Sequence, residues 1–169
     1  MTLTTHALVG AAAAAMVPQR PVLAFAAGFT SHFLIDAIPH KDYDGYLPSF
    51  HHDKANPLNN DMRLGKAFMG DLALIGSDAL FGLILSVLVF SYGLFELPLF
   101  WVLLGAGAAM VPDALQFVYF KTRSKILEPL QRLHIWIQQK SPLDTTFAVG
   151  FGLQCILVVV VIGFVIVGT

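Results

Sequence analysis

The chain has 169 residues, of which 56% are hydrophobic and 12% are charged, and its formal net charge is −1. A soluble domain carries about 25% charged residues, so this composition excludes a water-soluble protein and predicts a single integral membrane domain over residues 1–169. A near-neutral charge without a clustered basic face also argues against a nucleic-acid partner.

Apolar segments along the chain predict the helices of an all-α, polytopic membrane bundle. They cover residues 3–17, 21–38, 67–92, 98–120 and 143–167. A helix that crosses a bilayer needs about 20 residues. The last three segments reach this length, the second nearly does, and the first either enters the bilayer halfway or pairs with the second. The sequence therefore predicts four to five transmembrane helices.

Two polar stretches interrupt these segments. Residues 40–66 form a polar loop rich in Asp, Asn, His and Pro. Residues 125–139 carry Leu130, Leu133 and Ile137 at helical spacing, which predicts an interfacial amphipathic helix with its apolar face toward the lipid headgroups. Most Lys and Arg residues lie in or beside these stretches. The positive-inside rule then predicts a multi-pass protein of the inner (plasma) membrane whose N-terminus and basic loops are cytoplasmic.

Ionisable side chains inside the apolar segments are the main functional signal, because each costs about 2.5–3.5 kcal/mol at the bilayer centre. They are His6, His32, Asp36, Asp71, Asp78 and Asp113. At a rise of about 1.5 Å per residue, all except Asp78 are expected within roughly 12 Å of one membrane face. This clustering predicts a shared partner or a shared function.

His32, Asp36 and His40 stand at i, i+4 and i+8, on one stripe of a helix that Pro39 should end. Imidazole and carboxylate groups are ligands of divalent cations, with zinc favoured here and manganese or magnesium as alternatives. The predicted metal ligands are His6, His32, Asp36, His40, Asp71 and Asp113. The alternative is a buried His32–Asp36 hydrogen-bonded pair that only fixes helix packing.

Three residues are candidates for catalytic roles. Asp71 and Asp78 are seven residues apart on one helix face, so either could orient a ligand or act as a base. His134, on the amphipathic helix, could donate a proton above the site. The alternatives are that Asp71 stabilises a helix N-terminus and that His134 contacts lipid headgroups.

Three short motifs resemble those of the inner-membrane metal-dependent hydrolases of the LexA-regulated type. They are Thr5–Gly10, Ser31–Asp36 and Gly107–Asp113. The His32–Asp36 pair followed by His40 is also similar to part of the zinc-dependent phospholipase C site. The resemblance implies metal-dependent hydrolysis of a phosphate ester, such as a phospholipid or lipid phosphate, at the cytoplasmic face. The basic residues Lys121, Arg123 and Lys125 are expected to gather its anionic headgroup.

Two other classes of function remain open from the sequence. Intramembrane Asp and His residues also build proton or cation pathways in small transporters, in which case polar residues should continue across the bilayer. A non-catalytic scaffold subunit would instead show hydrogen-bonded pairs and no ion. Membrane lipid is the expected partner, and a pathway built from so short a chain would require a homo-oligomer.

Overall fold

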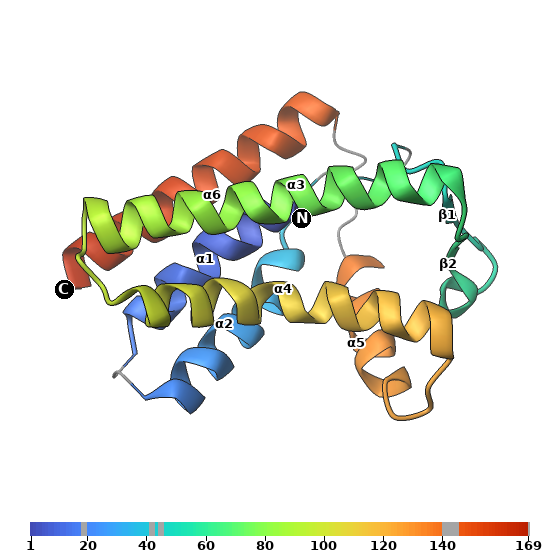
Figure 1. Ribbon diagram of the computed structural model, residues 1–169, viewed down its shortest axis with the longest axis horizontal. Coiled ribbons are helices and arrows are strands. Elements are labelled where there is room, and N and C mark those ends of the chain that lie inside the picture. Colours follow the sequence, from blue (N-terminus) through green and yellow to red (C-terminus); the bar gives the residue numbers. More distant parts are fainter. Residues whose placement is uncertain (18–19, 41–42, 44–45, 140–145, 169) are drawn as a thin grey trace.

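The computed structural model describes residues 1–17, 20–40, 43, 46–139 and 146–168. Within these residues the chain is almost entirely helical, which confirms the all-α class (Figure 1). The helices are α1 (Leu3–Ala15), α2 (Pro21–Asp36), α3 (Lys66–Val87), α4 (Leu99–Thr122), α5 (Glu128–Gln139) and α6 (Phe147–Gly168). A π-helical turn, Leu88–Gly93, continues α3. The predicted residues 143–145 of the last helix lie outside the described part of the chain.

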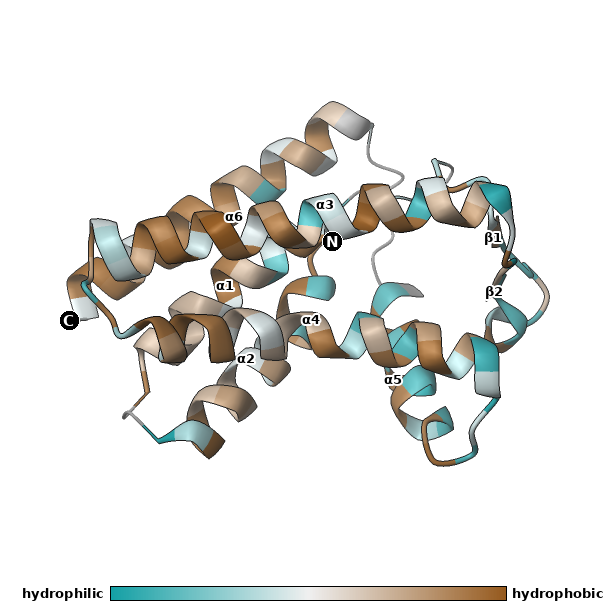
Figure 2. Ribbon diagram, in the orientation of Figure 1, coloured by the Kyte–Doolittle hydropathy of each residue, from teal (hydrophilic) through white to brown (hydrophobic). Residues whose placement is uncertain are grey.

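Three helical segments are long and apolar enough to cross a membrane: α3 with its π-helical turn, α4 and α6. The two remaining apolar helices are shorter, with 13 residues in α1 and 16 in α2. They rise about 20 Å and 24 Å, against a hydrocarbon core of about 30 Å. Figure 2 shows apolar residues dominating α6, whereas hydrophilic residues gather around the hairpin and α5.

Helix α1 lies inside the bundle and contacts α2, α3, α4 and α6. Its residues Ala7, Ala11 and Ala12 have no exposed surface. Small side chains let neighbouring helices approach closely, so contact between helices replaces contact with lipid over most of this helix.

Helices α1, α2 and α4 meet at three glycines. A Cβ atom built on Gly10 or on Gly28 would stand 2.4 Å from the carbonyl oxygen of Gly105. Only hydrogen fits there, so the three backbones touch directly. His32 follows Gly28 by four residues, and the same four-residue stripe continues to Asp36. The junction that packs the helices therefore also aims these polar side chains at one place.

The polar loop contains a small hairpin that the sequence did not predict. Strands β1 (Phe50–His51) and β2 (Asp61–Met62) pair antiparallel, and a 3-10 turn, Pro57–Asn59, lies between them. Strands of two residues are too short to show an alternating pattern of polar and apolar residues.

Two of the three basic residues assigned to a lipid headgroup are instead held by this hairpin. Lys121 Nζ lies 2.6 Å from Asp61 Oδ1. Burial raises the pKa of Asp61, but the hydrogen bond and the positive charge of Lys121, together with Met62 and Arg123, bring that pKa below its ordinary value. The Arg123 guanidinium donates to the carbonyl of Asn60 at 3.0 Å. Lys121 and Arg123 therefore hold the hairpin, and the headgroup role expected of them stays a prediction.

Helix α5 begins at Glu128, three residues after the predicted start. His134 and Ile137 face the protein and are buried, whereas Leu133 and Trp136 are exposed. The predicted orientation of Ile137 toward headgroups is therefore wrong. The helix turns toward the protein because His134 finds polar partners at the end of α2.

Candidate metal centre

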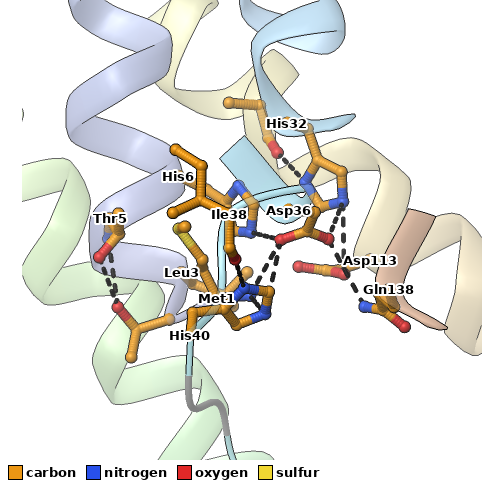
Figure 3. A network of polar contacts seen from close by, with 12 residues as sticks. Met1, Leu3, Thr5, His6, His32, Asp36, Ile38, His40, Asp113 and Gln138 are labelled. Atoms are coloured by element: carbon orange, nitrogen blue, oxygen red, sulfur yellow. Dashed lines mark hydrogen bonds and ion pairs between the residues drawn. The ribbon is translucent and has the colours of Figure 1, made fainter. Parts of the chain in front are cut away.

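The carboxylate of Asp36, at the end of α2, is completely buried and surrounded by imidazoles from three helices and a loop. Its Oδ2 lies 3.1 Å from His134 Nε2 and 3.3 Å from His32 Nε2. Its Oδ1 lies 3.3 Å from His6 Nε2 and 3.9 Å from His40 Nε2. Figure 3 shows this carboxylate among the imidazoles of His6, His32 and His40.

Three of these atoms form a nearly equilateral triangle. His32 Nε2 and His134 Nε2 are 3.2 Å apart, and each is within 3.3 Å of Asp36 Oδ2. Ligands bonded to a tetrahedral zinc ion at about 2.0–2.1 Å stand about 3.3–3.4 Å from one another. Asp113 Oδ1 lies farther out, 3.8 Å from His32 Nε2 and 3.7 Å from His134 Nε2. A catalytic zinc site has three protein ligands and leaves the fourth position to water. His32, His134 and Asp36 have the composition and spacing of three such ligands, and Asp113 stands beside them.

Backbone carbonyls fix the tautomers of two histidines. His32 Nδ1 lies 2.8 Å from the carbonyl oxygen of Ala109, and His40 Nδ1 lies 2.7 Å from that of Ile38. A carbonyl only accepts, so both Nδ1 atoms carry hydrogen, and each neutral ring presents a lone pair at Nε2. The lone pair of His32 then faces a carboxylate oxygen of Asp36, which is repulsive unless a cation or a proton lies between them. Metal-binding histidines are held in this way.

His6 offers a donor to the other carboxylate oxygen. Its ring has no exposed surface, its Nε2 lies 3.3 Å from Asp36 Oδ1, and its Nδ1 has no hydrogen-bond partner within the described residues. It stacks on His32, with ring centroids 4.1 Å apart. The Met1 ammonium stands 3.0 Å from Asp36 Oδ1 and 2.9 Å from His40 Nε2, so a positive charge is accommodated on this side. The neighbours of Oδ1 thus differ from those of Oδ2, as in a carboxylate that bridges two cations.

The structure brings together most of the predicted metal ligands and adds one. The predicted ligands found around Asp36 are His6, His32, His40 and Asp113. His134, predicted as a proton donor, belongs with His32 and Asp113 to a group that could hold a metal ion. Gln138, which the sequence analysis missed, lies one turn further along α5, with its Nε2 3.1 Å from His134 Nε2. Their four-residue spacing on an amphipathic helix was the available signal.

The structure places Asp71, predicted as both a ligand and a catalytic residue, outside this cluster. The side chain is buried, and its Oδ2 accepts a 2.8 Å hydrogen bond from the backbone N–H of Ser49. The Ser49 hydroxyl donates to the same oxygen. Asp71 therefore ties the polar loop to the start of α3.

Asp78 also lies outside the cluster, where it caps the N-terminus of α1. Its Oδ2 accepts from the backbone N–H of Leu3 at 2.6 Å, and its Oδ1 accepts from the Thr4 hydroxyl at 2.7 Å. A carboxylate at this position satisfies orphan helix donors and complements the helix dipole. Tyr43 donates to the same carboxylate, and burial together with Asp78 raises the pKa of the Tyr43 phenol.

An Asp71→Ala variant separates anchoring from metal binding. It removes the acceptor of two buried Ser49 donors, so we expect the free energy of unfolding to fall by about 1–3 kcal/mol. Metal content per chain should stay at the wild-type level. Thermal unfolding and elemental mass spectrometry of the purified protein measure the two quantities. Loss of metal from a folded variant would show that Asp71 contributes to metal binding, as the sequence predicted.

Comparisons with protein-family models, with curated proteins and with solved structures find no match to this chain.

Proposed function

We propose that this chain is a membrane-embedded, metal-dependent hydrolase of phosphate esters. The observation that carries the proposal is the buried set of three donors, His32, His134 and Asp36, with the carboxylate of Asp113 beside it. Nitrogen-rich tetrahedral sets favour zinc over manganese or magnesium. A bound zinc ion would lower the pKa of its water to about 7 and polarise a phosphoryl oxygen.

The residues around the metal position would have separate roles in the reaction. Ala109 orients His32, which keeps its Nε2 directed at the site. Asp113 has a side chain that is 29% exposed and lines a cavity, so it is the group of the cluster best placed to meet substrate and to take a proton from water. His6 and His40 would supply nitrogen ligands for a second ion at Asp36 Oδ1, where that ion would replace the Met1 ammonium.

The position of the cluster relative to the bilayer bears on the substrate. We place α3, α4 and α6 as spans, with α1 and α2 beside them in the bilayer and the basic stretches on the cytoplasmic side. The polar cluster then lies near one membrane face, within reach of lipid headgroups. This placement favours a phospholipid or a lipid phosphate as substrate.

Two features favour hydrolysis over the other classes. Beyond the cluster, fully buried apolar side chains such as Phe90, Val102 and Val165 dominate the described core, and the buried Ser86 hydroxyl donates to a carbonyl of its own helix, which does not favour a polar pathway across the bilayer. The His6 Nδ1 atom, buried without a hydrogen-bond partner among the described residues, does not favour a scaffold, because a packing residue normally satisfies its buried polar atoms.

Metal analysis of the purified protein tests the proposal. We expect about one or two zinc ions per chain, and removal of the metal by a chelator should abolish hydrolysis of lipid phosphates until zinc is restored. A His134→Ala variant removes a ligand, so its zinc affinity should fall by more than about 100-fold, beyond the loss seen for outer-shell residues. His51→Ala, on the exposed hairpin, is the matched control. A wild-type protein that binds no metal after reconstitution contradicts the proposal.

A further inference from the structure

A cavity of about 620 Å³ opens beside the metal centre, between α3, α4, α5 and the polar loop. Its volume lies within the range of small-molecule sites, about 300–1,000 Å³. At one end it is lined by Asp113, which stands beside the metal centre, and by Gln138. At the other end it is lined by Phe50 and Met62 of the hairpin.

The two long walls of the cavity are apolar stripes of antiparallel helices. From α3 the wall includes Phe68, Leu72, Ile75 and Ala79, at helical spacing. The distance from Phe68 to Ala79 along the helix axis is about 16 Å. From α4 the wall includes Met110, Ala114 and Phe117. The cavity is therefore elongated and runs along the helices away from the metal centre.

Aromatic rings stand at the hairpin end. Phe68 and Phe117 stack across the space between α3 and α4, with ring centroids 5.6 Å apart. Phe50 of the hairpin lies 6.0 Å from Phe120. The Lys121–Asp61 ion pair pins the hairpin over these rings. The end of the cavity is thus built from bulky side chains that limit the length of an occupant.

We infer that this cavity holds one hydrocarbon chain of the substrate, so that the substrate is an amphiphile with its phosphate at the metal centre. A long apolar space that ends beside the metal centre matches a molecule with an apolar chain and an anionic head. Leu72 lines the cavity and is 48% exposed at the surface of a candidate span, so a chain can enter sideways from the bilayer. The headgroup part rests on the proposed hydrolase function, whereas chain binding needs no metal.

The cavity selects and orients the chain rather than binding it tightly. Lipid tails are as apolar as the cavity wall, so a chain gains little hydrophobic free energy by moving out of the bilayer. Shape then decides which chains fit, and a covalent probe reports occupancy better than an affinity measurement.

The test uses an alkyl phosphate that carries a diazirine at the far end of its chain. The purified full-length protein in detergent is irradiated with this probe, and labelled peptides are mapped by mass spectrometry. We expect the label on Phe68, Phe117 and Phe120. Ala114→Trp fills the metal end of the cavity and should reduce this labelling by about tenfold or more, with metal content retained. Val118→Trp, on an exposed face of the same helix, should label like the wild type.

Ala79→Phe fills the cavity from the opposite wall and replaces Ala114→Trp if that variant does not fold. Label that spreads over lipid-facing residues and is unchanged by a folded cavity-filling variant overturns the inference. Metal and hydrolysis of chain-free glycerol phosphate without cavity labelling would leave the hydrolase standing and remove the chain site. Cavity labelling in a protein that binds no metal would keep the chain site and remove the hydrolase.

Discussion

Replacing Asp36 with asparagine is expected to strip the metal centre of its ions and to lower hydrolysis by about 10³-fold or more, because zinc contributes several kcal/mol to the transition state. The amide keeps the size of the side chain but removes the negative charge that the histidines at Oδ1 and at Oδ2 share. Its NH₂ group also turns a donor toward His32 and His134, where metal binding needs an acceptor. Elemental mass spectrometry and a lipid phosphate assay measure the two effects.

The control for this variant is Asp53→Asn, which makes the same chemical change in the polar loop. Asp53 accepts from the backbone N–H groups of Ala55 and Asn56 and touches no residue of the centre. Metal content and hydrolysis should match the wild type. If Asp36→Asn folds and keeps a full complement of metal, the ligand assignment is wrong, and the cluster is a buried hydrogen-bonded network.

The α2 part of the site could be predicted because helical spacing alone fixes it. His32 and Asp36 are four residues apart, so they share a helix face in any packing. Helical spacing also placed Asp78 on one face with Asp71, but it did not predict its partner. The position of a residue along its own helix does not specify which neighbouring helix its side chain contacts. The N-terminus of α1 packs against α3 at that level, and Asp78 caps it.

His134 shows a different limit of the sequence. The apolar positions around it predicted a helix lying on lipid headgroups, and His134 itself was predicted to donate a proton above the site or to contact headgroups. In the structure α5 turns that polar position inward to Asp36, which is nearly 100 residues earlier in the chain. Contacts at such separation depend on how several helices pack, and periodicity within one helix carries no information about them.

The glycines illustrate a prediction that can be made only from the packed helices. Gly10 and Gly28 were recognisable as small residues, but their shared partner Gly105 lies on α4. On that helix Gly105 and Gly107 are alike in the sequence. Only the former has neighbours within reach of an added Cβ atom.

Replacing Gly105 with alanine is expected to destabilise the protein by about 1–3 kcal/mol, the usual cost of overpacking. The new Cβ atom would stand 2.5 Å from the Gly10 carbonyl oxygen and 2.5 Å from Ala14 Cβ. Backbone cannot swing aside as a side chain does, so α1 must move away from α4. That movement displaces His6 and Asp113, and metal affinity should fall with stability.

Thermal unfolding in detergent measures the loss, with an expected fall in Tm of about 2–4 °C per kcal/mol for a chain of this size. Gly107→Ala is the matched control, since an added Cβ there meets nothing within 4 Å. Alanine favours a helix over glycine by up to about 1 kcal/mol, so the control should be as stable as the wild type or more stable, with metal content unchanged. Equal Tm values for the two variants would mean that the three helices do not touch at Gly105, and the geometry of the centre would lose its support. If Gly105→Ala lowers both Tm and metal affinity while Gly107→Ala lowers neither, the glycine junction positions the metal centre.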